Sequence, residues 1–239
     1  MWFFKKKRAE HALNELVEAL SEALGSKLIS IVLYGSRASG EYREGSSDVN
    51  VFLVLEDVSS DTLERMSAPV RAWLKLGHPA PVFVQKNELP IYANSLPIEF
   101  LDMQDHHKVI FGSDPFQGLK MDRANLRAQV AQELSVKQLK LRQAFLLAGT
   151  NAKKLREILL GSLPSILTLY RAVLRLEQDV PKGHKIMAAK ELSMRVGLDG
   201  DCLERLWNNH MRRETDNVQD LARQYLDGVG QVLTYLSRK

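Results

Sequence analysis

The chain has 239 residues, of which 45% are hydrophobic and 26% charged, values typical of a globular protein with a sizeable buried core. Its formal net charge of +4 suits an anionic ligand, but it lacks the dense basic stripe of a duplex DNA-binding protein. A single cysteine excludes an internal disulfide framework, and no apolar run reaches the roughly 18 residues of a membrane helix, so we expect a soluble, cytoplasmic protein.

The first half of the chain mixes helical and strand patterns. Residues 7–24 carry apolar side chains at helical spacing, and the nearly continuous apolar run at 28–34 predicts a strand buried on both faces. A short helical turn at 36–39 and a second strand at 49–55 follow. The remaining predicted elements of this half are a helix at 59–76, a short strand at 79–85, a short helix or loop at 87–94, a strand at 97–103 and one or two helical turns at 105–111.

The second half shows helical spacing and no convincing strand. Its predicted helices, separated mainly at glycines, cover about 121–148, 151–177, 185–196, 201–214 and 216–237. The sequence therefore predicts an α+β fold in two domains. A mixed sheet with flanking helices occupies residues 1–115, and an all-α helical bundle occupies residues 118–239.

A glycine and a serine directly follow the first predicted strand. Gly35 lets the backbone approach a phosphate because it has no Cβ, and Ser36 offers a hydroxyl and a backbone N–H to an anionic oxygen. Arg37 and Arg43 can add positive charge around the same anion. We therefore expect these four residues to hold the phosphates of a nucleotide.

Two oxygen-bearing side chains open the second predicted strand. Asp48 and Asn50 are two residues apart, so on a strand their side chains point to the same face. Paired oxygen ligands can bind a hard divalent cation such as Mg²⁺. A third carboxylate has to come from a neighbouring strand. Glu99, in the predicted strand 97–103, is the best candidate, and Asp102, on the opposite face of that strand, is the alternative.

The arrangement resembles the nucleotidyltransferase superfamily with the polymerase-beta-like fold, above all its small bacterial aminoglycoside and minimal nucleotidyltransferases. Gly35 and Ser36 match the Gly-Ser element of that superfamily, Asp48 matches its first metal carboxylate, and Glu99 matches its third. The motifs lie within residues 28–103. The helical second half resembles, more loosely, the substrate-binding domains of antibiotic-modifying members.

The resemblance implies transfer of an NMP from an NTP to a hydroxyl acceptor. It assigns Asp48, Asn50 and Glu99 as catalytic residues and as ligands of Mg²⁺ or Mn²⁺. In such two-metal sites one ion activates the attacking hydroxyl and the other neutralises the triphosphate.

Asn50 departs from the superfamily pattern, which has a carboxylate at this position. Asn offers one uncharged carbonyl oxygen, so it can bind one ion but bridges two ions poorly. An active transferase is the favoured interpretation. The alternatives are a catalytically silent nucleotide-binding or regulatory relative, and the nucleotidyltransferase-like partner of a two-component toxin-antitoxin pair. The acceptor, the choice of NTP and the partner, whether a second copy or a helical protein, stay open.

Overall fold

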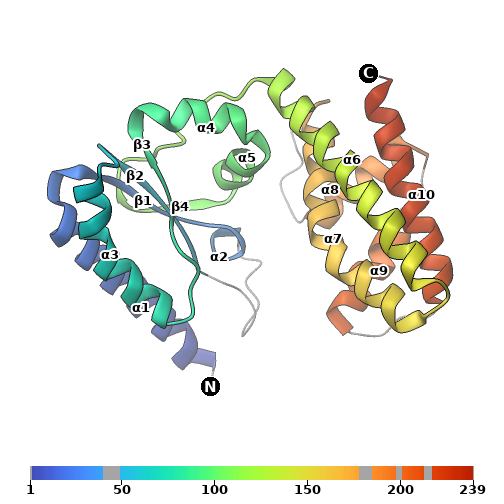
Figure 1. The fold of residues 1–239 in the computed structure, drawn as a ribbon, viewed down its shortest axis with the longest axis horizontal. Coiled ribbons are helices and arrows are strands. Elements are labelled where there is room, and N and C mark those ends of the chain that lie inside the picture. Colours follow the sequence, from blue (N-terminus) through green and yellow to red (C-terminus); the bar gives the residue numbers. More distant parts are fainter. Residues whose placement is uncertain (1, 40–48, 178–184, 198–200, 213–216, 239) are drawn as a thin grey trace. The chain divides into compact units, whose positions relative to one another are not determined.

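A computed structural model describes residues 2–39, 49–177, 185–197, 201–212 and 217–238 of the chain. It divides into two compact units, Met1–Met121 and Asp122–Lys239. The first unit contains all the described strands, and the second consists of helices (Figure 1).

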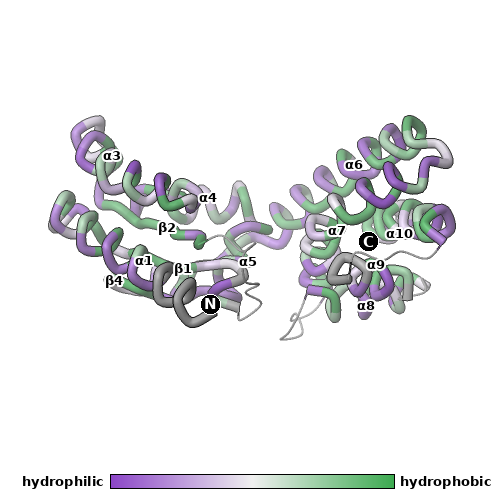
Figure 2. The backbone as a smooth tube through the Cα atoms, turned by 90° about the horizontal axis from the view of Figure 1, so that it is seen from below, coloured by the Kyte–Doolittle hydropathy of each residue, from purple (hydrophilic) through white to green (hydrophobic). Residues whose placement is uncertain are grey.

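The N-terminal unit is built on a four-stranded mixed sheet with the strand order β3-β2-β1-β4. The central strand β1 (Leu28–Tyr34) runs antiparallel to both β2 (Asn50–Leu55) and β4 (His107–Gly112). β3 (Val82–Gln85) lies at the edge and pairs with β2 in parallel. The central β1 and β2 are apolar along almost their whole length because both sheet faces are covered (Figure 2).

Alternate residues of β2 supply two separate cores. Leu53 belongs to a cluster that includes Leu20 of α1 (Trp2–Leu24) and Trp73 of α3 (Ser60–Lys75). Phe52, on the opposite face, packs in a cluster that includes Ala93 of α4 (Leu89–Ser95) and Phe100 of α5 (Pro97–Asp105). Two helices therefore cover each face of the sheet (Figure 1).

Short helical turns complete the unit at Gly25–Lys27, Lys86–Glu88 and α2 (Ser36–Ser39). At the start of α3 the Ser59 hydroxyl accepts a hydrogen bond from the Thr62 backbone N–H at 3.4 Å, as expected of a helix N-cap.

Two neighbouring elements have a different secondary structure from the predicted one. Residues 97–103, predicted as a strand, form most of helix α5, and the helical turns predicted at 105–111 are largely replaced by β4. Pro97 occupies the first turn of α5, where its missing N–H costs nothing, and Phe100 and Met103 are one helical turn apart and both buried. The run from His107 to Phe111 contains the β-branched and aromatic residues that favour a strand.

The C-terminal unit contains five described helices, and their positions confirm the predicted helical bundle. They are α6 (Arg123–Ala148), α7 (Ala152–Arg175), α8 (Lys185–Arg195), α9 (Asp201–Arg212) and α10 (Val218–Ser237). α7 packs against all four of the others. Among the described helices, it alone is long and apolar enough to cross a membrane, by length and composition only. More than half of its apolar stretch is buried, so its composition is accounted for by its position in the core.

Candidate nucleotide-binding site

The candidate site lies where β1 ends and β2 begins. Tyr34, the last residue of β1, is paired with Asn50, the first residue of β2. The next residue, Gly35, has a φ of +78°, a backbone conformation that side-chain-bearing residues rarely adopt. A Cβ built on Gly35 would lie 3.1 Å from Nδ2 of Asn50. Gly35 therefore both makes the turn and leaves room for the Asn50 amide.

Helix α2 continues directly from this turn. The Ala38 backbone N–H donates a hydrogen bond to the Gly35 carbonyl oxygen at 2.9 Å, which closes the turn. Arg37, the second residue of α2, has a half-buried side chain. The short helical turn predicted after Gly35 is confirmed, and it keeps Gly35, Ser36 and Arg37 at the end of β1.

The strand β4 places a third residue beside the paired Tyr34 and Asn50. His107, at the start of β4, is paired with Tyr34 on the side away from Asn50. Directly opposed residues of antiparallel strands share a face, so Asn50, Tyr34 and His107 lie side by side. Burial raises the pKa of the Tyr34 hydroxyl, which keeps this phenol protonated and uncharged at neutral pH.

His107 is fixed by contacts on both sides of its ring. Its Nδ1 lies 3.0 Å from the Gln104 carbonyl oxygen, and its Nε2 lies 3.2 Å from Oδ1 of Asp114. The ring also packs edge to face on Phe116, with centroids 4.8 Å apart. Sequence reasoning missed this residue because the segment was taken for helical turns. The β-branched and aromatic run after His107 was the signal that could have placed it on a strand.

Three phenylalanines attach α5 to the sheet face that carries Asn50. Phe52, two residues after Asn50 on β2, meets Phe100 of α5 edge to face at a centroid distance of 5.8 Å. It also stacks on Phe116 at 5.6 Å. All three rings are almost fully buried, so their packing holds α5 against the sheet beside the candidate site.

The two candidates for the third acidic residue, Glu99 and Asp102, lie in a different secondary structure from the predicted one. Glu99 and Asp102 lie on α5, not on a strand, so the argument that placed Glu99 at the metal site from its alternation along a strand is wrong. Three residues apart on a helix, Glu99 and Asp102 share a face, whereas a strand would have separated them. The Glu99 side chain is exposed and that of Asp102 is half-buried.

Two predicted site residues, Arg43 and Asp48, lie outside the described residues, and for Ser36 the structure describes the backbone alone. Within the parts of the chain that the structure describes, no three His, Cys, Asp or Glu side chains come together as a metal site. Asn50 itself brings one amide oxygen and no charge.

Comparison with known proteins finds a family model that matches most of the N-terminal unit. Residues 13–115 match the family model described as Nucleotidyltransferase domain. Among solved structures, the chain is similar to spectinomycin adenyltransferase AAD(9) from Enterococcus faecialis, crystallised with ATP and spectinomycin, with a TM-score of 0.56 and 14% sequence identity. The match covers 92% of this chain and 99% of that one, and at this identity it shows a shared fold. A search of curated proteins finds no significant match.

Proposed function

Because residues 13–115 form a nucleotidyltransferase domain with the fold found in aminoglycoside nucleotidyltransferases, we propose that this chain transfers an NMP from an NTP to a hydroxyl acceptor. The acceptor oxygen forms a bond to the α-phosphorus while the bond from that phosphorus to the bridging oxygen breaks. Pyrophosphate leaves with the bond electrons, and the hydroxyl proton passes to a base or to water.

The proposed nucleotide contacts come from the end of β1 and from α2. Gly35 lets the triphosphate approach the backbone, and Ser36 donates hydrogen bonds to it. Arg37 and Arg43 add charge-assisted hydrogen bonds, which are about twice as strong as neutral ones. The observation that carries the proposal is the position of Gly35. Its left-handed turn joins β1 to α2 directly beside the first residue of β2.

The proposed metal ligands are Asp48 and Asn50, with Glu99 or Asp102 as the third residue. Bound Mg²⁺ or Mn²⁺ would supply charge neutralisation at the triphosphate and would lower the pKa of the acceptor hydroxyl. Asn50 reduces the formal negative charge of such a ligand set by one. We infer that Asn50 makes transfer by the natural protein about 10²- to 10³-fold slower than a carboxylate at this position would allow, which is the usual effect of losing one electrostatic group.

Asn50→Asp tests this proposal with little change of shape. The side chains of Asn and Asp have nearly the same size, so the carboxylate can occupy the space beside Gly35 that the amide fills now. Pyrophosphate release should be measured with each NTP in Mg²⁺ and in Mn²⁺, first with water and then with hydroxyl compounds including spectinomycin as acceptors. We expect Asn50→Asp to raise turnover by about 10²-fold or more, and Asp48→Ala to abolish it.

Asn125→Asp is the matched control, because it makes the same chemical change in the first turns of α6, in the other unit. It should leave turnover unchanged. NTP binding measured by calorimetry separates the two main interpretations. NTP binding without turnover in either the natural protein or Asn50→Asp supports the silent, nucleotide-binding relative. No binding of any NTP to the natural protein refutes both interpretations.

A further inference from the structure

Helix α6 is apolar on two opposite faces. Its inner face packs in the bundle through buried residues that include Leu134 and Leu141. Its outer face carries four exposed aliphatic side chains, those of Val136 (45% exposed), Leu139 (58%), Leu146 (82%) and Leu147 (81%). The last two values are the highest among the large hydrophobic side chains that the structure describes. A surface helix of a globular protein normally has one apolar face, so the second face indicates a binding surface.

The outer face has the spacing of a coiled-coil seam. Its members Val136, Leu139, Gln143 and Leu146 are separated by three, four and three residues, as are the a and d positions of a heptad. With Leu147 the face spans about 16 Å, or three helical turns. Gln143 places a polar group in the middle of the seam, where polar residues fix the register of a helix pair. The face is one helix wide, so it fits a partner helix better than a broad surface such as a membrane.

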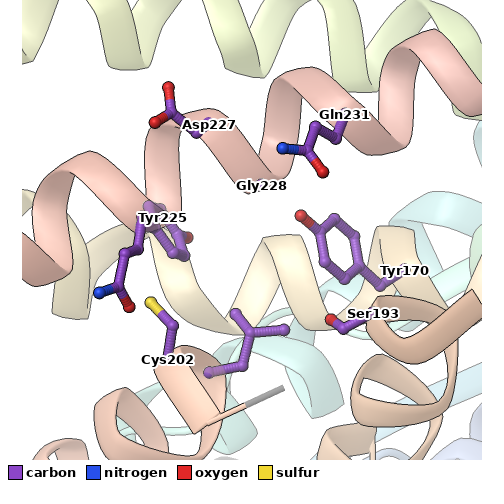
Figure 3. A pocket seen from close by; sticks show the side chains of 9 residues that line it. Tyr170, Ser193, Cys202, Tyr225, Asp227, Gly228 and Gln231 are labelled. Atoms are coloured by element: carbon purple, nitrogen blue, oxygen red, sulfur yellow. The ribbon is translucent and has the colours of Figure 1, made fainter. Parts of the chain in front are cut away.

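The interior of the C-terminal unit does not use this outer face. Helix α6 packs against α7 and α10. Helices α7 to α10 also form a half-open pocket of about 350 Å³, whose lining includes Tyr170, Ser193 and Cys202 (Figure 3). No residue of α6, which is described along its whole length, lines this pocket. The four aliphatic side chains are therefore not part of the core of the bundle.

The charged side chains beside the outer face are basic. Lys140 follows Val136 by four residues, and Arg142 lies three residues after Leu139, so both exposed side chains border the face. Residues 134–148 of α6 contain three basic residues and no acidic one. Two copies of the chain that packed through this face would bring four of these cations together without a counter-charge. A partner with acidic residues beside its apolar stripe would form ion pairs instead.

We propose that the outer face of α6 binds a helix of a partner protein, and that this helix has an apolar stripe at heptad spacing with Asp or Glu on both sides. The stripe packs on the four aliphatic side chains of the outer face, and the acidic residues pair with Lys140 and Arg142. This inference goes beyond nucleotide transfer and is independent of it, because it rests on α6 alone.

Two synthetic peptides of opposite charge test the proposal on the full chain. Each has about four heptads with leucine at the a and d positions, and the flanking e and g positions carry glutamate in one peptide and lysine in the other. We expect a dissociation constant of about 10–100 μM for the acidic peptide. The basic peptide should bind about tenfold more weakly, because repulsion replaces the ion pairs. Fluorescence anisotropy of labelled peptides measures both affinities. Equal affinities, or tighter binding of the basic peptide, refute the proposal.

Substitutions on α6 separate the apolar contact from the charges. Leu139→Gln with Leu146→Gln should weaken binding of the acidic peptide by about tenfold or more and leave thermal unfolding nearly unchanged, because both side chains are exposed. The matched control is Met187→Gln with Met194→Gln, which changes two exposed apolar side chains of α8 and should not alter the affinity. Lys140→Glu with Arg142→Glu should reverse the preference between the peptides. An unchanged preference in this variant refutes the assigned charge contacts.

Two other occupants of the outer face would give different results, and each would overturn the proposal. A dimer seen by analytical ultracentrifugation that is lost in Leu139→Gln with Leu146→Gln, without binding of the acidic peptide, would assign the face to a second copy of the chain. Sedimentation with phosphatidylglycerol vesicles that is lost in the same variant, again without binding of the acidic peptide, would assign it to an anionic membrane.

Discussion

Replacing Gly35 by alanine tests the geometry of the candidate nucleotide-binding site. The substitution adds one methyl group at a backbone position with a φ of +78°, 3.1 Å from the Asn50 amide nitrogen. Two separate costs therefore arise, one from the backbone conformation and one from the contact. Both act at the junction of β1, α2 and β2.

The two costs can be given magnitudes. A residue with a Cβ in the left-handed region costs about 1–2 kcal/mol, part of which is offset by the lower entropy of the unfolded alanine chain. The contact with Asn50 adds up to about 1 kcal/mol, because the amide can move by a few tenths of an ångström. For a unit of about 120 residues, each kcal/mol lowers the melting temperature by about 4 °C. We expect a loss of about 1–2 kcal/mol in all.

Gly77→Ala is the matched control. Gly77 has a φ of +86° and no neighbouring atom within 4 Å of a built Cβ, so it isolates the backbone term. Hydrogen exchange of β1 and β2 peptides in the full chain, together with thermal unfolding, measures both variants. Gly35→Ala should be the more destabilised, and the excess should disappear in an Asn50→Ala background. Equal costs for the two glycines, or an excess that persists without the Asn50 side chain, would refute the reasoning.

Three further substitutions test other parts of the fold. Hydroxyl hydrogen bonds, first from Ser59, hold the pKa of Asp57 below its ordinary value, so Asp57→Asn should lower stability at neutral pH. That stabilisation is complete above the unfolded pKa of about 3.9 and is lost as the pH falls further. The free energies of unfolding in urea of the natural protein and of Asp57→Asn should therefore converge in acid and differ at pH 7. Gly112→Ala would put a Cβ 1.9 Å from the Ile29 carbonyl oxygen, so we expect a loss above about 3 kcal/mol and little soluble protein, and a normal yield would contradict this contact. Tyr225→Phe should cost about 1 kcal/mol in chemical denaturation, because a hydroxyl on α7 loses its partner, and an unchanged midpoint would mean that the bond contributes nothing.

The sequence predicts the central part of the fold well because its strands and helices differ clearly in periodicity. The apolar run 28–34 coincides with β1, and helix α3 begins at Ser60, one residue after the predicted start. The exchange of α5 and β4 shows the limit of such reasoning. In residues 97–103 the apolar positions 98, 100 and 103 fit a strand and a helix about equally well, and only packing of Phe100 and Met103 on the sheet decides.

Only the part of the candidate site that depends on local sequence could be predicted. The turn at Gly35 follows from local sequence, because a glycine after a buried strand can adopt the left-handed conformation that the turn needs. The pairing of Tyr34 with His107 joins strands far apart in the chain, and no local pattern contains that information. The same limit applies to the third acidic residue, since Glu99 was chosen from a strand that does not exist.

The position of β1 has a consequence for biosynthesis. Its partner on one side, β2, follows after a short connection, but its other partner, β4, begins only at His107. A nascent chain that has not yet reached this residue exposes one unpaired edge of an apolar strand, which is a site for intermolecular pairing. The hydrogen bond from the buried Ser30 hydroxyl to the Ser113 carbonyl oxygen, 2.7 Å long, can form only after β4 has been made. Fragments that end before β4 should therefore aggregate even though they contain Gly35 and Asn50.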